Sequence, residues 1–507
     1  MAPSSPELIH WVRRGTRTVL LAQVASQIVS IGVLAIMLRL VEPAEYGLLG
    51  MILPAVMLPR MAALLGLSTA VLQRDLSSDQ LAGLFWLNAV WGLVAAAVTA
   101  ACGLWLSEAW DEPQLAPLCL ALAGATLIAA LGSQHQALLE RKLLLGPLAG
   151  IRLLALACGG FAGIYTARRG AGVWALVAQQ YAELLVLSVW VWLVEPWRPG
   201  WPKRGGEQAI GLVRFSTYYS LSQLAYYTAQ NLDKILLPVL LGARAAPAVG
   251  LYSQAFSLMM RPALLLTSPL TGVMVAGLSQ ASHDRAAHAA LVARFFHLVG
   301  VGLFPCAAGL LVVAPDVMVV LGGSQWQGAG GVLAALAPAL FVQGMINVSM
   351  HVLAAAGKSG RLLVATVLLC LLLLPGTLAG FFLGRAYLGS SLGDEVRGAT
   401  IGLAIGYTSV LVMVWFIPYL WFCLGSAGVR PWAVLRPLWP ALRASLLMGL
   451  VVGGLTLFPA VQSLAPLPRL GLLVAAGAAC YLLLAWREIA WWWHELVHLR
   501  DAPPAIP

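Results

Sequence analysis

The sequence predicts an all-α polytopic membrane protein of about fourteen transmembrane helices, arranged as two parallel six-helix lobes followed by two C-terminal helices. Of its 507 residues, 60% are hydrophobic and only 10% are charged, and the mean hydropathy is +0.86. Soluble domains carry about 25% charged residues. Apolar runs that are long enough to cross about 30 Å of hydrocarbon recur from one end of the chain to the other.

The N-terminal lobe is expected at residues 1–195 and contains six apolar runs, which short polar or Pro/Gly-containing stretches separate. A basic, Pro/Gly-rich linker, "PWRPGWPKRGGE", opens the segment 196–209 that follows the lobe. The six spans are predicted at 15–40, 46–72, 81–106, 114–138, 143–166 and 171–195.

The C-terminal lobe is expected at residues 210–426, and two further spans occupy residues 427–490 before a tail at 491–507. None of the breaks between these spans has room for a soluble catalytic domain. The eight spans are predicted at 210–242, 246–278, 288–314, 327–356, 361–386, 398–424, 443–462 and 467–487.

The loop charges predict the orientation, because Lys and Arg are enriched in short cytoplasmic loops. Fourteen spans place both termini on one side, where 17 of the 30 Lys and Arg residues lie, against 7 on the other side. Both termini and the linker are therefore expected in the cytoplasm, and the loop at 388–398 on the outer side. The net charge of +10 reflects this bias, so we expect no nucleic-acid partner.

An internal repeat relates the first span to the seventh. "QIVSIGVLAIMLRLVEPAEYGL" starts at Gln27, and "QNLDKILLPVLLGARAAPAVGL" starts 203 residues later at Gln230. The two stretches share the leading Gln and a closing Gly-Leu pair. Since both copies begin on the same side of the membrane, the repeat of six helices is parallel rather than inverted.

Several stretches resemble a known family. "LVEPAEYGLLGM" (40–51) and "LGLSTAVLQRDLSSDQLAGLFWLN" (65–88) are similar to its N-terminal segment, and "LDKILLPVLLGARAAPAVGLYSQAFSLMMRPALLL" (232–266) is similar to the start of its second lobe. The family is the polysaccharide-transporter branch of the MOP superfamily, the Wzx-like oligosaccharide flippases. The resemblance covers roughly residues 15–425.

This resemblance implies a transporter rather than an enzyme. Such proteins move polyprenyl-diphosphate-linked oligosaccharides across the bacterial inner membrane by alternating access, for O-antigen, capsule or exopolysaccharide synthesis. The implied partners are the lipid-linked substrate, membrane lipids and a polysaccharide polymerase. No organic cofactor is expected; a coupling cation, H⁺ or Na⁺, is left open.

Two isolated arginines are candidates for binding the diphosphate. Arg60 lies 15 residues from Glu45 and 14 from Arg74, which is roughly 21 Å of helix on either side and places it near mid-membrane. Arg261 is similarly deep in the eighth span. A guanidinium binds phosphate with paired hydrogen bonds and stays charged when buried. We predict that the two side chains clamp the diphosphate from opposite lobes; the alternative is a structural role, such as a contact with Glu183.

Polar residues at helical spacing form a candidate sugar path. Aromatic and amide side chains suit hydroxyl-rich ligands, although hydrogen bonds between helices are the competing interpretation. The stripe on the seventh span comprises Tyr219, Gln223, Tyr227, Gln230 and Lys234, and it is joined by Gln27 on the first span and Gln343 and Asn347 on the tenth. Asp233 and Glu183 are intramembrane acids and therefore candidate coupling sites, or else structural partners of buried arginines.

The tail contains the zinc-protease pattern His494-Glu495-Leu496-Val497-His498. Only nine residues follow His498, and Asp501 is the sole acid among them, so no distant third ligand is available. The preceding Trp491–Trp493 run is typical of an aromatic membrane anchor. We therefore predict a short surface helix and no metal site, and the seven cysteines, which form no CxxC pair, point the same way.

Two other functions remain as alternatives. A multidrug exporter of the same superfamily would favour acidic cavities for cationic ligands, whereas the lone charges of spans two and eight are arginines. A membrane glycosyltransferase or acyltransferase would display catalytic acids or His in sizeable loops. The longest outer loop, "RAYLGSSLGDEVRG" (385–398), holds Asp394 and Glu395 without a supporting His.

Overall fold

The computed structural model shows a helical protein, which confirms the predicted fold class; no strand occurs in the residues that it describes. These residues are 5–64, 77–142, 144–201, 206–280, 284–355 and 359–499. For 5–21, 63–64, 206–223, several positions within 269–280, 354–355, 359 and 494–499, the backbone alone is described. The chain divides into two compact units, Met1–Gly250 and Leu251–Pro507, and each unit is treated separately below.

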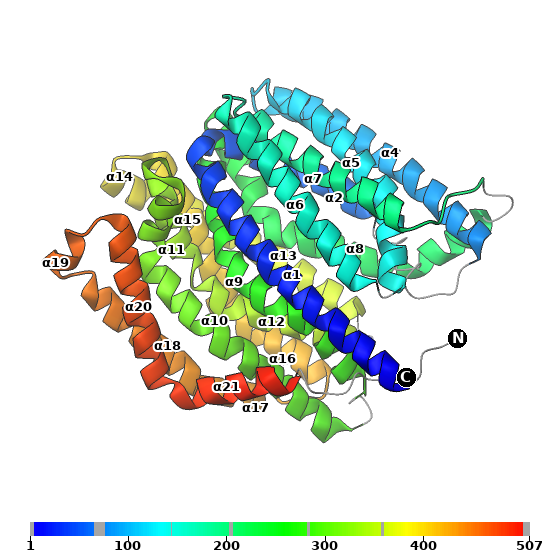
Figure 1. Cartoon of the computed structure of the whole chain (residues 1–507). Helices are drawn as coiled ribbons and strands as arrows, with labels where there is room; N and C mark the ends of the chain where they lie inside the picture. The colour runs from blue at the N-terminus through cyan, green and yellow to red at the C-terminus, as the bar shows by residue number, and fades with distance from the viewer. Residues whose placement is uncertain are drawn as a thin grey trace. The chain divides into compact units, whose positions relative to one another are not determined.

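Unit 1 is a bundle of long helices in which neighbours in sequence pack side by side. Helices α4 and α5 pair along their lengths, α6 pairs with α7 and with α1, and α2 lies against α4, α5 and α8; the paired α4 and α5 are visible in Figure 1. Its helices are α1 (Ser5–Leu40), α2 (Pro43–Leu64), α4 (Ser78–Ala109), α5 (Leu115–Arg141), α6 (Leu145–Arg168), α7 (Val173–Val194), α8 (Gly206–Leu241) and the 3₁₀ turn η1 (Gly242–Arg244).

The first turns of α2 and of α9 (Ala245–Gln280) cross at two glycines of unit 1. A Cβ added to Gly47 would overlap the carbonyl of Ala246, and a Cβ added to Gly250 would overlap the carbonyl of Pro43. Only glycine permits this approach of two backbones. These are the two glycines that the 203-residue repeat aligns, and the contact is reciprocal across the same offset.

The end of the predicted N-terminal lobe at Glu195 and the start of the predicted linker, residues 196–201, pack onto the end of the α4–α5 pair within unit 1. The Trp201 ring stacks on Trp86 with centroids 4.8 Å apart. The buried carboxylate of Glu195 accepts two hydrogen bonds from Lys142 Nζ, at 2.7 and 2.8 Å. This part of the linker is therefore attached to the helices that precede it.

Unit 2 is built around α10, which contacts most of the later helices. Helices α11, α12, α18 and α20 all pack on it, and α13 pairs with α15. Its elements are the remainder of α9, α10 (Arg285–Gly322), η3 (Ser324–Trp326), α11 (Gln327–Leu336), α12 (Ala339–Ala355), α13 (Ser359–Leu383), η4 (Gly384–Leu388), α14 (Gly389–Leu392), α15 (Glu395–Ser409), η5 (Val410–Trp415), α16 (Phe416–Ser426), α17 (Pro431–Leu435), η6 (Arg436–Leu438), α18 (Trp439–Leu455), α19 (Pro459–Gln462), α20 (Pro466–Leu484) and α21 (Trp486–Leu499).

A ladder of glycines lets α13 and α15 approach backbone to backbone. A Cβ on Gly380 would strike the backbone of Gly402 and Gly406, and a Cβ on Gly402 would strike Gly380 and Gly384. Small residues spaced four apart allow helices to approach this closely. In a membrane, close packing rather than the hydrophobic effect drives the association of helices.

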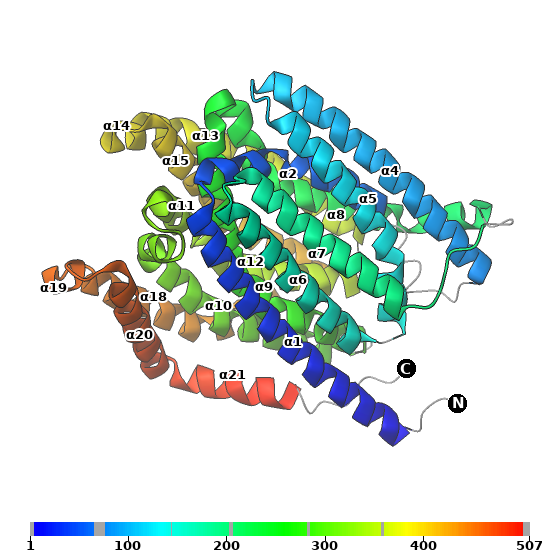
Figure 2. The same cartoon turned by 45° about the horizontal axis from the view of Figure 1, so that its top comes forward.

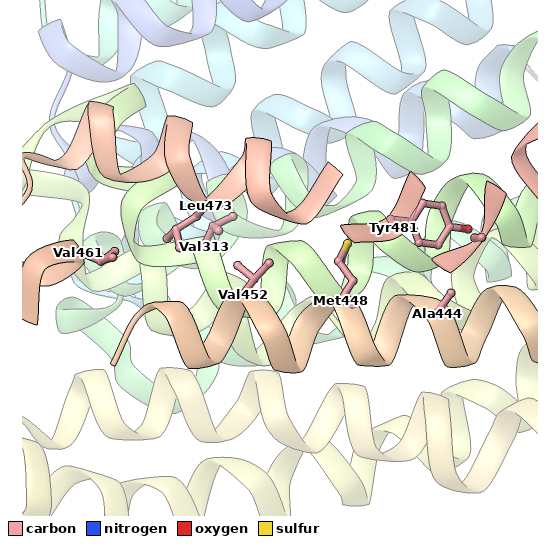
Figure 3. Packing of buried hydrophobic residues seen from close by; sticks show 9 residues of the cluster. Val313, Ala444, Met448, Val452, Val461, Leu473 and Tyr481 are labelled. Carbon is pink, nitrogen blue, oxygen red and sulfur yellow. The ribbon is translucent and has the colours of Figure 1, made fainter. Parts of the chain in front are cut away.

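The last two predicted spans, α18 and α20, form a layer against α10. Figure 3 shows Met448, Val452 and Tyr481 in the hydrophobic cluster that joins them. The Tyr481 hydroxyl donates to the Val301 carbonyl at 2.9 Å, and Arg469 forms an ion pair with the buried Asp316. These contacts fix the C-terminal helices to α10 at several heights.

The helix following α20 turns away from it (Figure 2) and is also attached to α10. In α21, the Trp492 Nε1–H donates to the Leu298 carbonyl at 3.0 Å, and Glu488 lies 2.6 Å from His297. The predicted short surface helix is therefore present, but it begins at Trp486. One of its three consecutive tryptophans hydrogen-bonds within the protein, whereas the exposed side of the helix carries Trp486 and Trp493.

The helices of the described part give a lower number of candidate spans than the fourteen predicted. In the described part of the chain, eleven helices are long and apolar enough to span a membrane, or twelve if a bent pair forms one span. The predicted second span runs into residues 65–76, outside the described part, and the predicted seventh and eighth spans join into one candidate, Leu224–Ser268. The count of fourteen stays a prediction.

Two predicted features of unit 2 have a different form. The predicted span 327–356 is broken, because α11 and α12 meet at 58° around Pro338. The expected outer loop at 385–398 is mostly helical: Asp394 caps α15 by accepting from the Arg397 amide at 3.0 Å, and Glu395 pairs with Arg385 at 2.9 Å. Asp394 is therefore a helix cap and Glu395 is a member of a surface ion pair, and both of these roles are structural.

Candidate functional site

Arg60 lies on α2, directly after Pro59, with its side chain half-buried. No hydrogen bond or ion pair joins it to another residue in the part of the chain that the structure describes. Since desolvating a charge is costly, an arginine in a membrane helix normally has a partner or lines a polar cavity. The second case applies here.

A cavity of about 270 Å³ lies beside Arg60 within unit 1. Helix α2 supplies the guanidinium, and α5 and α7 supply the facing walls. The other lining residues are Ala129, Ser133, Gln136, Ala137 and Glu140 of α5 and Leu184, Leu187 and Ser188 of α7. One wall is therefore polar and the other is mostly apolar.

The polar groups of the cavity are held in fixed roles by their neighbours. Ser133 Oγ donates to the Ala130 carbonyl at 2.8 Å and accepts from Asn88 Nδ2 at 2.7 Å. Ser188 Oγ donates to the Ile128 carbonyl at 3.2 Å. Both serine hydroxyls thus donate their hydrogen bond to a backbone carbonyl, so toward the cavity they can only accept, and Ser133 has one lone pair left for this.

Glu140, the acid at the end of the polar wall, is paired. Its Oε1 accepts from Arg152 Nη2 at 2.8 Å, on the exposed side of α6. The carboxylate is therefore paired with a cation other than Arg60. The guanidinium at the cavity therefore has no carboxylate partner in the described part of the chain.

Arg261, the other predicted diphosphate ligand, lies half-buried on α9 in unit 2. The predicted clamp joins Arg60 and Arg261 across the two units and stays a prediction.

The predicted sugar path on α8 is described only in part, because the side chains of Tyr219 and Gln223 lie outside the described residues. Gln230 Nε2 donates to the Tyr226 hydroxyl at 2.6 Å, and Lys234 Nζ donates to Asn231 Oδ1 at 2.9 Å. These contacts run along α8 itself. Tyr227 also lies on this helix and is half-buried.

The remaining sugar-path residues lie on separate helices. Gln27 is half-buried on α1 in unit 1. In unit 2, Gln343 and Asn347 lie on α12, after the break at Pro338; Gln343 is only 1% exposed, so it lines no open surface in this structure.

The two candidate coupling acids differ in their surroundings. Asp233 is fully buried on α8, and its Oδ1 accepts from the Lys234 amide at 2.9 Å. Glu183 is half-buried on α7, where Gly159 of α6 leaves room for it. Among the described residues, Glu183 makes no hydrogen bond or ion pair, so none of them serves as the arginine partner considered for it.

The zinc-protease pattern lies on α21, and the side chains of His494, Glu495 and His498 are outside the described residues. Within the described part, no group of three or more His, Cys, Asp or Glu is arranged to hold a metal ion.

Sequence reasoning missed the polar wall of the cavity. Ser133, Gln136 and Glu140 are three and four residues apart, so they share one face of α5. This spacing was a usable signal in an apolar span. The position of Arg60 opposite that face, by contrast, depends on packing between α2 and α5.

Comparison with known proteins finds similarity to proteins of polysaccharide biosynthesis. A family model described as polysaccharide biosynthesis protein matches residues 36–330. The chain is 23% identical over 435 residues to the lipopolysaccharide biosynthesis protein WzxC of Escherichia coli (strain K12), covering 83% of this chain and 84% of that protein. It is 26% identical over 308 residues to the succinoglycan biosynthesis transport protein ExoT of Rhizobium meliloti (strain 1021), covering 60% of each.

Among solved structures, the fold resembles that of the lipid II flippase MurJ in an inward closed conformation. The TM-score is 0.68, and the match covers 94% of this chain and 99% of that one at 13% identity. At this identity the likeness shows a common fold alone. The resemblance seen in the sequence motifs is confirmed at the level of the family and the fold.

Proposed function

Because the chain belongs to the polysaccharide biosynthesis protein family, we propose that it is a flippase for saccharide units linked to a membrane lipid. In this proposal it is a transporter, not an enzyme. It moves polyprenyl-diphosphate-linked oligosaccharides from the inner to the outer leaflet by alternating access, and no covalent bond changes. The relatives named for lipopolysaccharide and succinoglycan biosynthesis support a role in making cell-surface polysaccharide.

The observation that carries the proposal is the guanidinium of Arg60, which lines a cavity in a bundle of apolar helices and has no polar partner among the described residues. A diphosphate brings negative charge into the membrane, and a guanidinium compensates it with two parallel hydrogen bonds. In the described residues no carboxylate competes for Arg60, since Glu140 is bound to Arg152. A guanidinium that has no ionic partner among the described residues favours an anionic ligand over the cationic ligands of a multidrug exporter.

The proposal assigns further roles that rest on the sequence. Arg261 would bind the diphosphate from the second lobe, and the residues of the α8 stripe would contact the sugars. Glu183 or Asp233 would bind the coupling cation, H⁺ or Na⁺. The proposal also puts the protein in the bacterial inner membrane with both termini in the cytoplasm; the excess of Lys and Arg on that predicted side supports the orientation. A polysaccharide polymerase would take up the unit after transfer.

Deletion of the gene tests the function directly. We expect lipid-linked oligosaccharide to accumulate in the cytoplasmic leaflet and the surface polymer to disappear, and the intact gene to restore both. The lipid is measured by its accessibility to a membrane-impermeant glycosidase in spheroplasts. Normal surface polymer in a deletion strain that has no second flippase would contradict the proposal, and drug sensitivity alone would support a multidrug exporter instead.

A further inference from the structure

A stripe of arginine and tryptophan runs along one side of the helical segment Pro431–Leu455, which comprises α17, η6 and α18. Trp432, Arg436, Trp439 and Arg443 follow one another at intervals of four, three and four residues, which is the spacing of a single helix face. All four side chains are exposed, Trp432 to 72% and Trp439 to 60%. These four residues are called the Arg/Trp stripe below.

The opposite face of the segment packs within unit 2. Val434, Leu438 and Ala441 are buried, and α17, η6 and α18 all contact α10. Further along α18, Met448 and Val452 enter the hydrophobic cluster shown in Figure 3. The Arg/Trp stripe therefore points away from α10 and α20, and the exposed side of a spanning helix is the side that faces lipid.

The two arginines of the stripe have no anionic partner in the described part of the chain. Neither Arg436 nor Arg443 makes a hydrogen bond or ion pair with a described residue. The sequence provides no acid nearby either, since residues 396–487 contain no Asp or Glu. Because a charge in hydrocarbon is costly, arginines on the lipid-facing side of a span require an anion from outside the chain or access to the interface.

The length of α18 places the stripe at the border of the hydrocarbon. The helix has 17 residues from Trp439 to Leu455, or about 25 Å, which is most of the hydrocarbon thickness of about 30 Å. Trp439 thus lies near the lipid headgroups, where tryptophan is enriched. Arg443 lies one turn deeper. Side chains lean toward the N-terminus of their helix, so the Arg443 guanidinium extends back toward the headgroups at Trp439.

Beyond Arg443 the same side of α18 becomes aliphatic. Leu446, Leu447 and Leu450 are exposed, Leu450 to 73%. A ligand lying along this side meets guanidinium and indole groups at one end and only hydrocarbon at the other. An anionic phospholipid has its phosphate and its acyl chains in the same order. A soluble anion or an acidic protein segment would match only the charged end.

We propose that the Arg/Trp stripe and the aliphatic side of α18 together bind one anionic phospholipid of the surrounding bilayer. Arg436 and Arg443, which are seven residues or about 10 Å apart along the helix, hold the phosphate from its two sides. The acyl chains lie along Leu446 and Leu450. The inference does not depend on the proposed function, because the bound lipid belongs to the bilayer and is not transported.

Lipid binding to the purified full-length protein tests the proposal. The protein is stripped of lipid in detergent and titrated with phosphatidylglycerol or with phosphatidylcholine of the same acyl chains, and native mass spectrometry measures the bound lipid. We expect phosphatidylglycerol to bind about tenfold more tightly to the wild-type protein, as two arginines at a membrane surface allow. Inorganic phosphate should not displace it, because phosphate has no acyl chains to lie along α18.

Variants assign the preference to the two arginines. Arg436→Gln and Arg443→Gln should each reduce the preference for phosphatidylglycerol about threefold and should together remove it, with the binding of phosphatidylcholine unchanged. Arg443→Lys should keep most of the preference, because the charge remains. Arg285→Gln is the matched control, since it removes an exposed arginine on the same predicted side of the membrane with no tryptophan within one turn. Its preference should stay at tenfold.

The thermal midpoint shows whether the variants fold. Because neither arginine contacts another described residue through a polar bond, the double variant should match the wild type in phosphatidylcholine. Phosphatidylglycerol should raise the midpoint of the wild type and not that of the double variant, since a ligand that binds only the folded protein stabilises it. A lower midpoint of the double variant in phosphatidylcholine would assign the arginines to the fold and contradict the proposal.

Other results would also overturn the lipid site. Equal binding of the two lipids to the wild type, or an unchanged preference in the double variant, would exclude it. A loss in Arg285→Gln as large as in the double variant would show that net charge attracts the lipid. Tighter binding of soluble polyglutamate than of phosphatidylglycerol would assign the stripe to an acidic protein partner, and displacement by inorganic phosphate would assign it to a soluble anion. The flippase function is tested separately by the deletion strain.

Discussion

At the scale of single residues, Arg60 is the side chain whose role the structure constrains most. It is charged, half-buried in a membrane helix and beside a cavity, and it makes no polar contact with the residues that the structure describes. A guanidinium that holds the fold together would have such contacts. Its charge has no partner among the described residues, which is the basis for proposing it as a ligand-binding group.

Substitution of Arg60 separates binding from folding. We expect Arg60→Ala to reduce transport at least tenfold with normal protein abundance, because charge-assisted hydrogen bonds to phosphate are lost without leaving a buried group unpaired. Arg60→Lys should restore transport partly, since an ammonium keeps the charge but lacks the planar pair of N–H donors with which a guanidinium binds phosphate. Complementation of a deletion strain and immunoblots of membranes measure the two quantities.

The control is Arg169→Ala, which removes an exposed arginine that lies over the Tyr165 ring at the far end of α6. It should complement fully. Arg261→Ala should match Arg60→Ala if both arginines hold the diphosphate. Full complementation by both Ala variants would exclude the clamp, and failure of both to accumulate would indicate structural roles.

At the scale of elements, the glycine ladder between α13 and α15 makes a prediction about stability. Gly402→Ala places a methyl group against the backbone of Gly380 and Gly384, and neither can yield as a flexible side chain would. Overpacking of this kind costs about 1–3 kcal/mol. We expect a lower thermal midpoint for the purified protein, measured by size-exclusion chromatography after heating.

Gly471→Ala is the matched control, because Gly471 lies on the exposed side of α20 with open space around its Cα. Its midpoint should be unchanged or slightly raised, since alanine favours the helix. Equal losses at Gly402 and Gly471 would show that helix propensity, not the approach of α13 to α15, sets the stability.

The elements also show what the sequence was able to predict. Hydropathy located the apolar helices and the resemblance named the family, because both depend on local composition and motifs. The break at Pro338 and the helical turn through residues 385–392 were missed. Apolar residues on both sides concealed the first, and polar residues suggested a loop for the second, although the helix continues there against α15.

The candidate site was predicted less completely than the helices. Arg60 is the lone charge of its predicted span. The spacing of Ser133, Gln136 and Glu140 predicts a shared helix face, but not that α2 packs opposite it. The donor and acceptor roles of the two serines depend on hydrogen bonds to Ala130 and Ile128. Such roles are properties of packed helices and not of any stretch of sequence.

At the scale of the whole molecule, the distribution of Lys and Arg predicts the topology. Ser390 and Arg285 are both exposed, and they are expected on opposite sides of the membrane. An impermeant thiol reagent added to intact cells should label Ser390→Cys and should reach Arg285→Cys only after lysis. The native cysteines, which are buried or half-buried where the structure describes them, give the background. The reverse labelling pattern would overturn the orientation.

The reciprocal contact between the starts of α2 and α9 has the symmetry of a homodimer interface. Two identical chains that pair about a twofold axis meet in this way, residue i against j and residue j against i. Gly47 against Ala246 and Gly250 against Pro43 repeat that pattern at one constant offset within a single polypeptide. It is the arrangement expected when duplication and fusion turn an ancestral homodimer into one chain. In a homodimer, one mutation changes both copies of such a contact. In the fused chain, the two copies are separate positions that mutate independently.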